Sequence, residues 1–202
     1  AQEVKMPAII ASEYYENSGR MQGFGSSIFK LKDRGNKHMV LGPTHEELFA
    51  YAAKSMIKSY KNMPFNLYQF QTKFRDEPRA RFGLVRVKEF VMKDAYSFDT
   101  NEEGLNISYK KMFDAYKKSF DEMGIEYRIV KADTGIMGGL LSEEFQAISP
   151  IGEDVLCYCD DCDYSSNLEV SKVVLKEASK EEHKTKELVE TLHKSSIEDV
   201  CK

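Results

Sequence analysis

The spacing of apolar residues predicts two amphipathic helices. The first follows Thr44, which stands three residues before Glu47, the spacing of a capping box. Apolar residues then recur at helical spacing at Leu48, Phe49, Ala52, Ala53, Met56, Ile57 and Tyr60. The second begins with the same signal at residues 100–103 and ends at Gly124. Each helix is therefore expected to pack along one face.

The segment between these helices alternates with the period of a β-strand. In FNLYQFQTKFRDE, at residues 65–77, one face carries Tyr68, Phe70 and Phe74. The opposite face carries polar residues, namely Gln69, Gln71, Lys73, Arg75 and Glu77. We expect the aromatic face to be the core. A loop rich in Pro, Arg and Gly at 78–83 leads to a second predicted strand at 84–92, which indicates an antiparallel hairpin with a long connection.

The remaining pattern predicts an α+β fold. Further strands are expected at 126–131, 144–149 and 154–158. Antiparallel hairpins mixed with helices are typical of α+β domains rather than of alternating βαβ units. The character of the sequence changes near residue 150, so we expect one domain over 1–150 and the beginning of another over 151–202. From Lys172 onward the alternating Lys and Glu residues indicate a solvated helical face or linker.

Composition narrows the class of protein only slightly. The 202 residues carry a formal net charge of −4, which argues weakly against a nucleic-acid-binding surface spread over the whole chain. No apolar run approaches the ~20 residues of a membrane span, and the first residues lack the pattern of a signal peptide. We therefore expect a cytoplasmic protein without a membrane partner. Both ends interrupt predicted elements, so we expect the chain to be a fragment.

The predicted hairpin carries side chains that suit ATP. Arg75 and Arg86 can bind phosphates, Glu77 can accept a hydrogen bond from an exocyclic amine, and Phe90 can stack on a base. Alternation alone favours a different interpretation, a surface sheet with charged cross-strand pairs and a half-buried Phe. The order of the residues changes that balance.

Three segments share one resemblance. KFRDE at 73–77, followed by a loop with Phe-Gly, R-x-K-E-F and MKDAYSFD, resembles motif 2 of class II aminoacyl-tRNA synthetases in its bacterial prolyl-tRNA synthetase version. LGPTHEE at 41–47 and ADTGIMGG…EEF at 132–145 are similar to the same family, in the same order. Together the three segments cover most of residues 1–170. The resemblance implies a class II catalytic domain built on an antiparallel sheet with flanking helices.

The resemblance also implies roles for the residues of the hairpin. Arg75 would bridge the α-phosphate of ATP and the carboxylate of proline, stabilising the charge that develops as the carboxylate attacks phosphorus. Glu77 would hold the adenine side of ATP, Arg86 would reach the outer phosphates, and Phe90 would stack on the adenine. Thr44 and Glu46 would select proline, with the carboxylate meeting its charged imino group. Thr44 is also a good helix N-cap.

The implied activity is that of a proline–tRNA ligase. Such an enzyme joins L-proline to the 3′ end of tRNA(Pro) through prolyl-adenylate, with Mg²⁺ accompanying the ATP phosphates. Pro7 stands where class II synthetases carry the motif 1 proline, near a dimer interface, so a homodimer is implied. Motif 3 and an anticodon-binding domain are not found in these residues, and 151–202 is similar to the beginning of an editing insertion. We therefore expect this chain alone to be inactive.

Two alternatives stay open at this point. One is another class II synthetase of the same subgroup, against which the T-H-E-E and MKDAYSFD segments argue. The other is a catalytically silent relative that binds a metabolite or a protein partner, although such a relative has no reason to keep Arg75, Glu77, Arg86 and Phe90.

Two departures from the family pattern affect particular contacts. The loop reads DEPRARFG where the family usually has Arg-Pro-Arg, so Pro78 and Ala80 place the loop's conformation and its contact with the tRNA acceptor end in question. Glu143 stands where a histidine is common, so no role of that histidine is carried over.

The cysteines give a separate signal. Cys159-x-x-Cys162, with Cys157 close by, has the spacing of zinc ligands, but a structural site needs four and no second pair follows. His183, His193 and Cys201 are too scattered to be assigned. A C-x-x-C turn without a metal is the better interpretation.

Overall fold

The computed structural model describes residues 1–79, 81–135, 139, 141–172, 188, 190–191 and 196. The chain divides into two compact units, Ala1–Ser171 and Lys172–Lys202, and every element with described bounds lies in the first. The boundary expected near residue 150 stays a prediction about the complete protein. The Lys/Glu-rich segment lies almost entirely outside the described residues. Of the helices within the described ranges, none combines the length and apolar composition that a membrane span requires.

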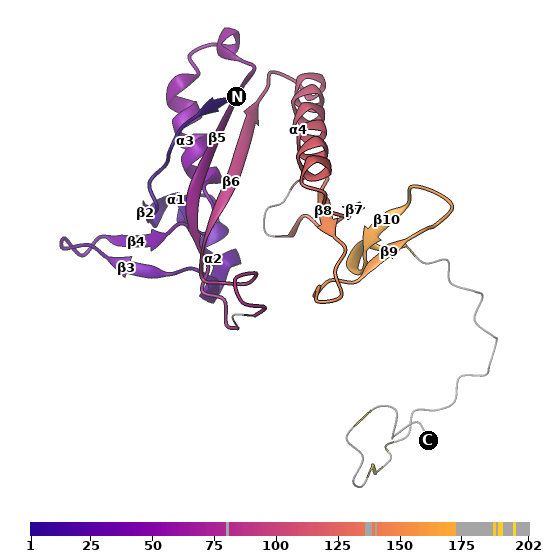
Figure 1. Cartoon of the computed structure of the whole chain (residues 1–202). Helices are drawn as coiled ribbons and strands as arrows, with labels where there is room; N and C mark the ends of the chain where they lie inside the picture. Colours follow the sequence, from indigo (N-terminus) through magenta and orange to yellow (C-terminus); the bar gives the residue numbers. More distant parts are fainter. Residues whose placement is uncertain are drawn as a thin grey trace. The chain divides into compact units, whose positions relative to one another are not determined.

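The first unit combines helices with three sheets (Figure 1). Its helical segments are α1 Glu13–Asn17, α2 Arg20–Phe24, η1 Gly25–Ser27, α3 Glu46–Met56, η2 Tyr60–Asn62, α4 Glu102–Glu122 and η4 Leu168–Val170. Its strands are β1 Gln2–Glu3, β2 Ile9–Ala11, β3 Lys30–Lys32, β4 His38–Leu41, β5 Phe65–Phe74, β6 Glu89–Phe98, β7 Tyr127–Lys131, β8 Glu143–Ala147, β9 Leu156–Tyr158 and β10 Ser165–Asn167. The sheet orders are β1-β5-β6, β2-β4-β3 and β8-β7-β10-β9. The predicted α+β class is confirmed.

The β5–β6 hairpin is the longest pairing in the described chain. Its antiparallel register runs from Phe65 opposite Phe98 to Phe74 opposite Glu89. The hairpin was expected, but the predicted second strand at 84–92 is wrong, because β6 begins only at Glu89. The backbone turns before that point: Phe82 and Gly83 have positive φ, and an isolated bridge joins Arg81 to Arg86. The strand continues through KDAYSF at 93–98, a segment that the sequence pattern did not assign to a strand.

The buried face of β5 is the polar one, so the predicted orientation of this strand is wrong. Gln69, Gln71 and Lys73 are buried, whereas Phe70 is 56% exposed. Each buried polar side chain has a partner. The amide of Met6 donates to Gln69 Oε1 at 3.0 Å, Gln71 Nε2 donates to the carbonyl of Met6, and Lys73 pairs with an acidic residue of β6. A buried polar group that has a partner avoids the desolvation cost of an unpaired one. Polar residues can therefore face inward, and the alternation of polar and apolar residues alone could not show which face of β5 is buried.

Helices α3 and α4 contact opposite faces of β6. From α3, Phe49 stacks on Tyr96 with ring centroids 4.1 Å apart. From α4, the hydroxyl of Tyr116 accepts a hydrogen bond of 2.7 Å from Lys93 Nζ. Positions 93 and 96 differ by an odd number, so their side chains leave β6 on different faces. Figure 1 shows the two helices on the two sides of the hairpin.

Both helices begin later than their capping signals predicted. The N-cap of α3 is His45 rather than Thr44, and α3 ends at Met56, so Tyr60 lies outside it in η2. The N-cap of α4 is Asn101, whose side chain accepts a hydrogen bond from the amide of Gly104 at 2.8 Å. An Asn side chain at the N-cap satisfies an amide that lacks a helical partner.

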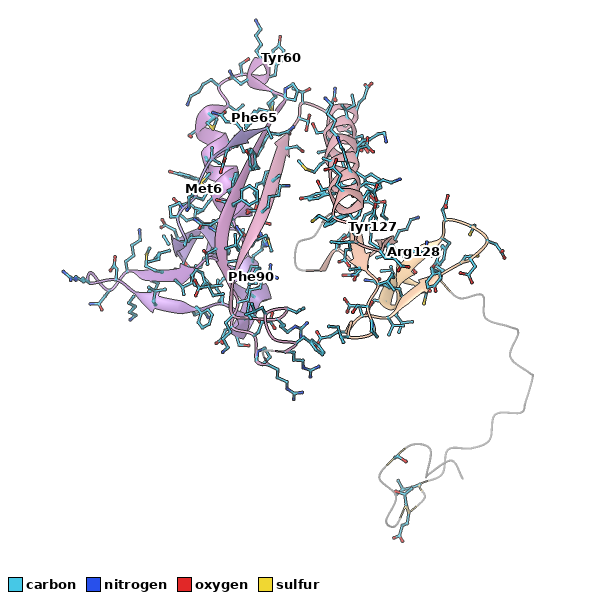
Figure 2. The ribbon with its side chains drawn as sticks, in the orientation of Figure 1. Met6, Tyr60, Phe65, Phe90, Tyr127 and Arg128 are labelled. Atoms are coloured by element: carbon cyan, nitrogen blue, oxygen red, sulfur yellow. The ribbon has the colours of Figure 1, made fainter. Side chains whose placement is uncertain are left out.

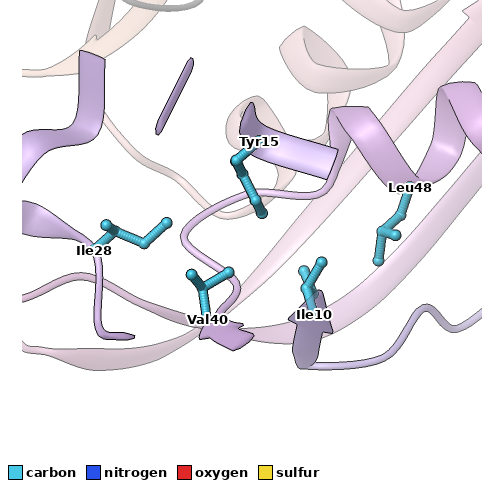
Figure 3. Close-up of a cluster of buried hydrophobic side chains, with 5 residues drawn as sticks. All are labelled: Ile10, Tyr15, Ile28, Val40 and Leu48. Atoms are coloured by element: carbon cyan, nitrogen blue, oxygen red, sulfur yellow. The ribbon is translucent and has the colours of Figure 1, made fainter. Parts of the chain in front are cut away.

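The main apolar core lies beside the sheet of β2, β4 and β3. Its buried members are Ile10, Tyr15, Ile28, Val40 and Leu48. Figure 3 shows them converging from two of these strands, α1, α3 and the segment before β3. Because Val40 and Leu48 belong to this core, it holds β4 and α3 in place, and with them the segment at 42–45 that joins the two.

Candidate active site

A pocket of roughly 410 Å³ lies at the loop end of the β5–β6 hairpin. All four residues predicted for ATP line it: Arg75, Glu77, Arg86 and Phe90. Its volume lies within the range of small-molecule pockets. The residues are not arranged on two strand faces as predicted. Only Phe90 belongs to a strand, since β5 ends before Arg75 and β6 begins after Arg86.

Arg75 is held between the hairpin and the segment that precedes α3. Its amide donates to the carbonyl of Lys88 at 2.9 Å, and its Nε donates to the carbonyl of Pro43 at 3.4 Å. The guanidinium carbon lies 5.4 Å from the centroid of the Phe90 ring, a cation–π distance. Figure 2 shows Phe90 at the loop end of the hairpin. Arg75 therefore presents a fixed cation beside an aromatic ring.

Two further guanidinium groups meet one carboxylate at the same pocket. Glu153 forms ion pairs with Arg86 at 2.8 Å and with Arg81 at 3.1 Å. Both arginine side chains are nearly half exposed, so water screens these pairs and each contributes little to stability. The pairing shows that Arg86, which lines the pocket, and the neighbouring Arg81 can contact one anionic group together.

Thr44 and Glu46 lie together at the beginning of α3. The hydroxyl of Thr44 donates to the Glu46 carboxylate, and the carbonyl of Thr44 accepts a hydrogen bond of 2.6 Å from the hydroxyl of Tyr15. Arg20 forms an ion pair of 3.1 Å with Glu46. The contact of Arg75 with Pro43 links this turn to the wall of the pocket.

The family model of the tRNA synthetase class II core domain (G, H, P, S and T) matches residues 29–195 of the chain. The chain belongs to this family. The fold agrees with that assignment, because the paired antiparallel strands of the hairpin carry the segment that resembles motif 2.

Curated relatives of this class II core are proline–tRNA ligases. The chain is 49% identical over 200 residues to the Proline--tRNA ligase of Thermoanaerobacter sp. (strain X514), covering 99% of the chain and 35% of that protein. It is 55% identical over 169 residues to that of Caldicellulosiruptor saccharolyticus, covering 84% and 30%. It is 44% identical to that of Oleidesulfovibrio alaskensis, covering 100% and 35%. The chain thus spans about a third of the length of these relatives.

A solved structure with a similar fold belongs to another synthetase. It is the RNA binding domain of threonyl-tRNA synthetase from Cryptosporidium parvum Iowa II, with a TM-score of 0.59 and 25% sequence identity. The similarity covers 65% of this chain and 32% of that chain.

Sequence reasoning missed a buried polar cluster beside the Thr44–Glu46 turn. Lys73 Nζ lies 2.8 Å from Asp94 Oδ1 and 2.6 Å from His45 Nδ1. Burial lowers the pKa of Lys73, although Asp94 opposes the shift, and burial with the nearby Lys73 cation lowers the pKa of His45. The sequence signal that could have indicated this cluster was Lys73, which lies among buried positions of β5, together with Asp94 on the paired strand β6.

The two departures from the family pattern fall partly within the described residues. Glu143 begins β8 and accepts a hydrogen bond of 2.7 Å from the hydroxyl of Tyr109 on α4. Partial burial and this hydrogen bond raise the pKa of Tyr109 to about 12. Glu143 therefore fastens α4 to β8. Pro78 precedes the pocket loop, whereas Ala80 lies outside the described residues, as do four residues of the 132–145 segment.

The three described cysteines are free thiols at and after β9. The amide of Asp161 donates to Cys159 Sγ, and this contact and hydrogen bonds from Cys162 lower the pKa of Cys159. The described residues contain no group of three or more His, Cys, Asp or Glu side chains placed to hold a metal ion. His183, His193 and Cys201 lie outside the described residues.

Proposed function

We propose that the chain is part of a proline–tRNA ligase that activates L-proline with ATP and transfers the prolyl group to the 3′ end of tRNA(Pro). The observation that carries the proposal is the meeting of Arg75, Glu77, Arg86 and Phe90 in one pocket, in a chain of the class II core family. The names of the relatives supply the amino acid, since the pocket alone suits ATP for any member of the family.

The proposed first step is the attack of a proline carboxylate oxygen on the α-phosphorus of ATP. An O–P bond forms, the bond to the β-phosphate bridge breaks, and pyrophosphate leaves. Arg75 lies at the pocket wall, where its cation can offset the charge that builds on the phosphoryl oxygens. Arg86 is proposed to bind the outer phosphates, Phe90 to stack on adenine, and Glu77 to accept a hydrogen bond from the amino group of adenine.

The proposed second step transfers the prolyl group. A hydroxyl of the terminal ribose of the tRNA attacks the carbonyl carbon of prolyl-adenylate, loses its proton, and AMP leaves. Glu46 is proposed to meet the charged imino group of proline, which requires its carboxylate to exchange the contact with Arg20 for the substrate. Thr44, whose hydroxyl already binds Glu46, orients that carboxylate.

Further partners belong to the same proposal. We also propose a homodimer, a cytoplasmic location and an editing domain that follows the catalytic one. Mg²⁺ is assigned to the phosphates of ATP, since it commonly binds through substrate phosphates and one or two carboxylates. The described residues offer no larger ligand cluster, so we derive no step through the metal ion.

The test is amino-acid-dependent exchange of pyrophosphate into ATP. Because the chain spans about a third of its relatives, the assay uses a protein of their full length that contains this chain. With all twenty amino acids compared, we expect exchange with proline and a fall of roughly 100-fold or more in Arg75→Ala. Arg128→Ala is the matched control, because Arg128 lies 5.1 Å from the ring centroid of Tyr158 and does not line the pocket.

The possible results separate the alternatives. Exchange with another amino acid would assign the chain to a different member of the class II subgroup. The absence of exchange with every amino acid would favour a silent binding protein. This 202-residue chain assayed alone is expected to be inactive.

A further inference from the structure

The buried cluster of His45, Lys73 and Asp94 has no direct role in the proposed chemistry. The side chain of Lys73 is 0% exposed and that of Asp94 is 10% exposed, while His45 is completely buried. Lys73 and Asp94 form an ion pair at 2.8 Å. A charged group so deeply buried needs an explanation, because its desolvation costs several kcal/mol.

The contacts of His45 define one tautomer of its ring. An ammonium group can only donate, so the 2.6 Å contact with Lys73 Nζ requires a lone pair on Nδ1. The other ring nitrogen, Nε2, lies 3.0 Å from the carbonyl of Pro7, which can only accept, so Nε2 carries the proton. Both requirements are met by a neutral ring, in agreement with the lowered pKa of His45.

The backbone beside the ring is built to accommodate it. A Cβ at Gly42 would lie 2.8 Å from Ile10 Cδ1 and 3.1 Å from His45 Cε1, so any larger residue there would require the end of the Ile10 side chain and the imidazole ring to shift. Gly42 is also bonded on both sides, through its amide to the carbonyl of Ala8 and through its carbonyl to the amide of Phe74. The imidazole therefore occupies a closed space between β2, β5 and the beginning of α3.

The cluster is also connected to the Thr44–Glu46 turn through Tyr96. The hydroxyl of Tyr96 donates to Asp94 Oδ2 at 2.6 Å, and Gln69 Nε2 donates to the same oxygen at 3.0 Å. Tyr96 also interacts with the side chain of Thr44, and burial raises its pKa, so its hydroxyl keeps its proton. Asp94 thus connects Lys73 with Thr44, while Lys73 connects directly with His45, which stands between Thr44 and Glu46.

Stability alone does not account for this arrangement. Replacing a buried ion pair with apolar residues of similar size is often neutral or stabilising, so the pair is weak evidence for a stabilising role. What it specifies is geometry, because directional contacts allow one orientation where an apolar core would allow several. We propose that Lys73 is a positioning residue of the proline site, which holds His45 and thereby the backbone that carries Thr44 and Glu46. This inference rests on the proposed function.

Two variants test the inference by different routes. Lys73→Met with Asp94→Asn removes both charges together, so that no buried charge is left unpaired. His45→Gln keeps a donor that can reach Pro7 and leaves the Lys73–Asp94 pair in place, but it replaces the rigid ring, which contacts Pro7 and Lys73 at once, with a flexible amide. The matched control is Lys110→Met with Asp114→Asn, the same substitutions in an exposed pair of α4.

The measurement is pyrophosphate exchange in a protein of the relatives' full length, with KM for proline, KM for ATP and kcat determined separately. Circular dichroism first establishes that each variant is folded. We expect KM for proline to rise tenfold or more in the Lys73/Asp94 variant and to rise in His45→Gln, while KM for ATP changes less than twofold. The Lys110/Asp114 control should match the unsubstituted protein.

Other outcomes would overturn the inference. A folded His45→Gln variant with unchanged KM for proline would show that the ring does not set the turn. Equal changes in both KM values would indicate a general structural role for the cluster. If the unsubstituted protein fails to exchange with proline, the proposed function fails and the assignment of this cluster to a proline site fails with it.

Discussion

Glu153 forms ion pairs with the guanidinium groups of Arg81 and Arg86, which could otherwise contact a nucleotide phosphate. It bridges Arg81 and Arg86 at the wall of the candidate ATP pocket, and it is 28% exposed there. A carboxylate and a phosphate oxygen make the same kind of charge-assisted contact with arginine. If Arg86 binds the outer phosphates as proposed, Glu153 must first release it.

Replacing Glu153 should consequently tighten the binding of ATP. An exposed ion pair contributes about 0.2–1 kcal/mol, so Glu153→Gln should lower KM for ATP by about 1.4- to fivefold in the exchange assay. Glu122→Gln is the control, because Glu122 forms an exposed pair of 3.8 Å with Lys118 on α4. An unchanged or raised KM for ATP in Glu153→Gln would indicate that this carboxylate does not compete with the nucleotide.

At the level of single residues, the sequence predicted the residues that line the pocket and missed the buried polar cluster of His45, Lys73 and Asp94. Arg75, Glu77, Arg86 and Phe90 were predicted together because the resemblance to motif 2 names them, and the structure brings them into one pocket. Lys73 was placed on a polar outer face, since a lysine in a strand usually contacts water. Its burial depends on Asp94 and His45, which lie 21 and 28 positions away in the sequence.

At the level of elements, helices and strands were easier to predict than their ends. The hairpin, α3, α4 and the strands near 127, 144 and 156 were all expected, because their periodicity extends over several residues. The beginning of β6 depends on a local turn with positive φ at Phe82 and Gly83, which alternation does not report. Neighbouring residues also compete for the N-cap position of a helix. The pattern predicted Thr100 for α4, whereas the structure has Asn101 at this position.

The competition at α4 gives a direct test. Asn101→Ala should lower the free energy of unfolding by about 1 kcal/mol, because it removes the acceptor for the amide of Gly104. Urea unfolding of the 202-residue chain measures the change. Thr100→Ala is the control and should alter stability by less than about 0.5 kcal/mol, as expected for a surface substitution. A larger loss of stability in Thr100→Ala than in Asn101→Ala would support Thr100 as the N-cap, as the sequence pattern predicted.

At the scale of the whole molecule, the strand pairings bear on where a domain ends. The change in sequence character suggested a boundary near residue 150, but β9 and β10 follow that point and belong to the sheet of β7 and β8. Strand β10 pairs with β7, with Ser166 opposite Lys131, and both Ser166 and Val130 are almost completely buried. A cut at residue 150 would remove two of the four strands of this sheet.

Truncation therefore separates the two boundaries. A chain of residues 1–171 keeps every paired strand that the structure describes and should unfold within about 2 °C of the 202-residue chain, the shift expected for ~1 kcal/mol or less. A chain of residues 1–150 uncovers Val130, whose burial contributes about 1.5–3 kcal/mol, so its midpoint should fall by roughly 4 °C or more. Thermal unfolding followed by circular dichroism measures both. Equal midpoints for the 150- and 171-residue chains would mean that β9 and β10 add nothing to the first domain, and the boundary near residue 150 would then be correct.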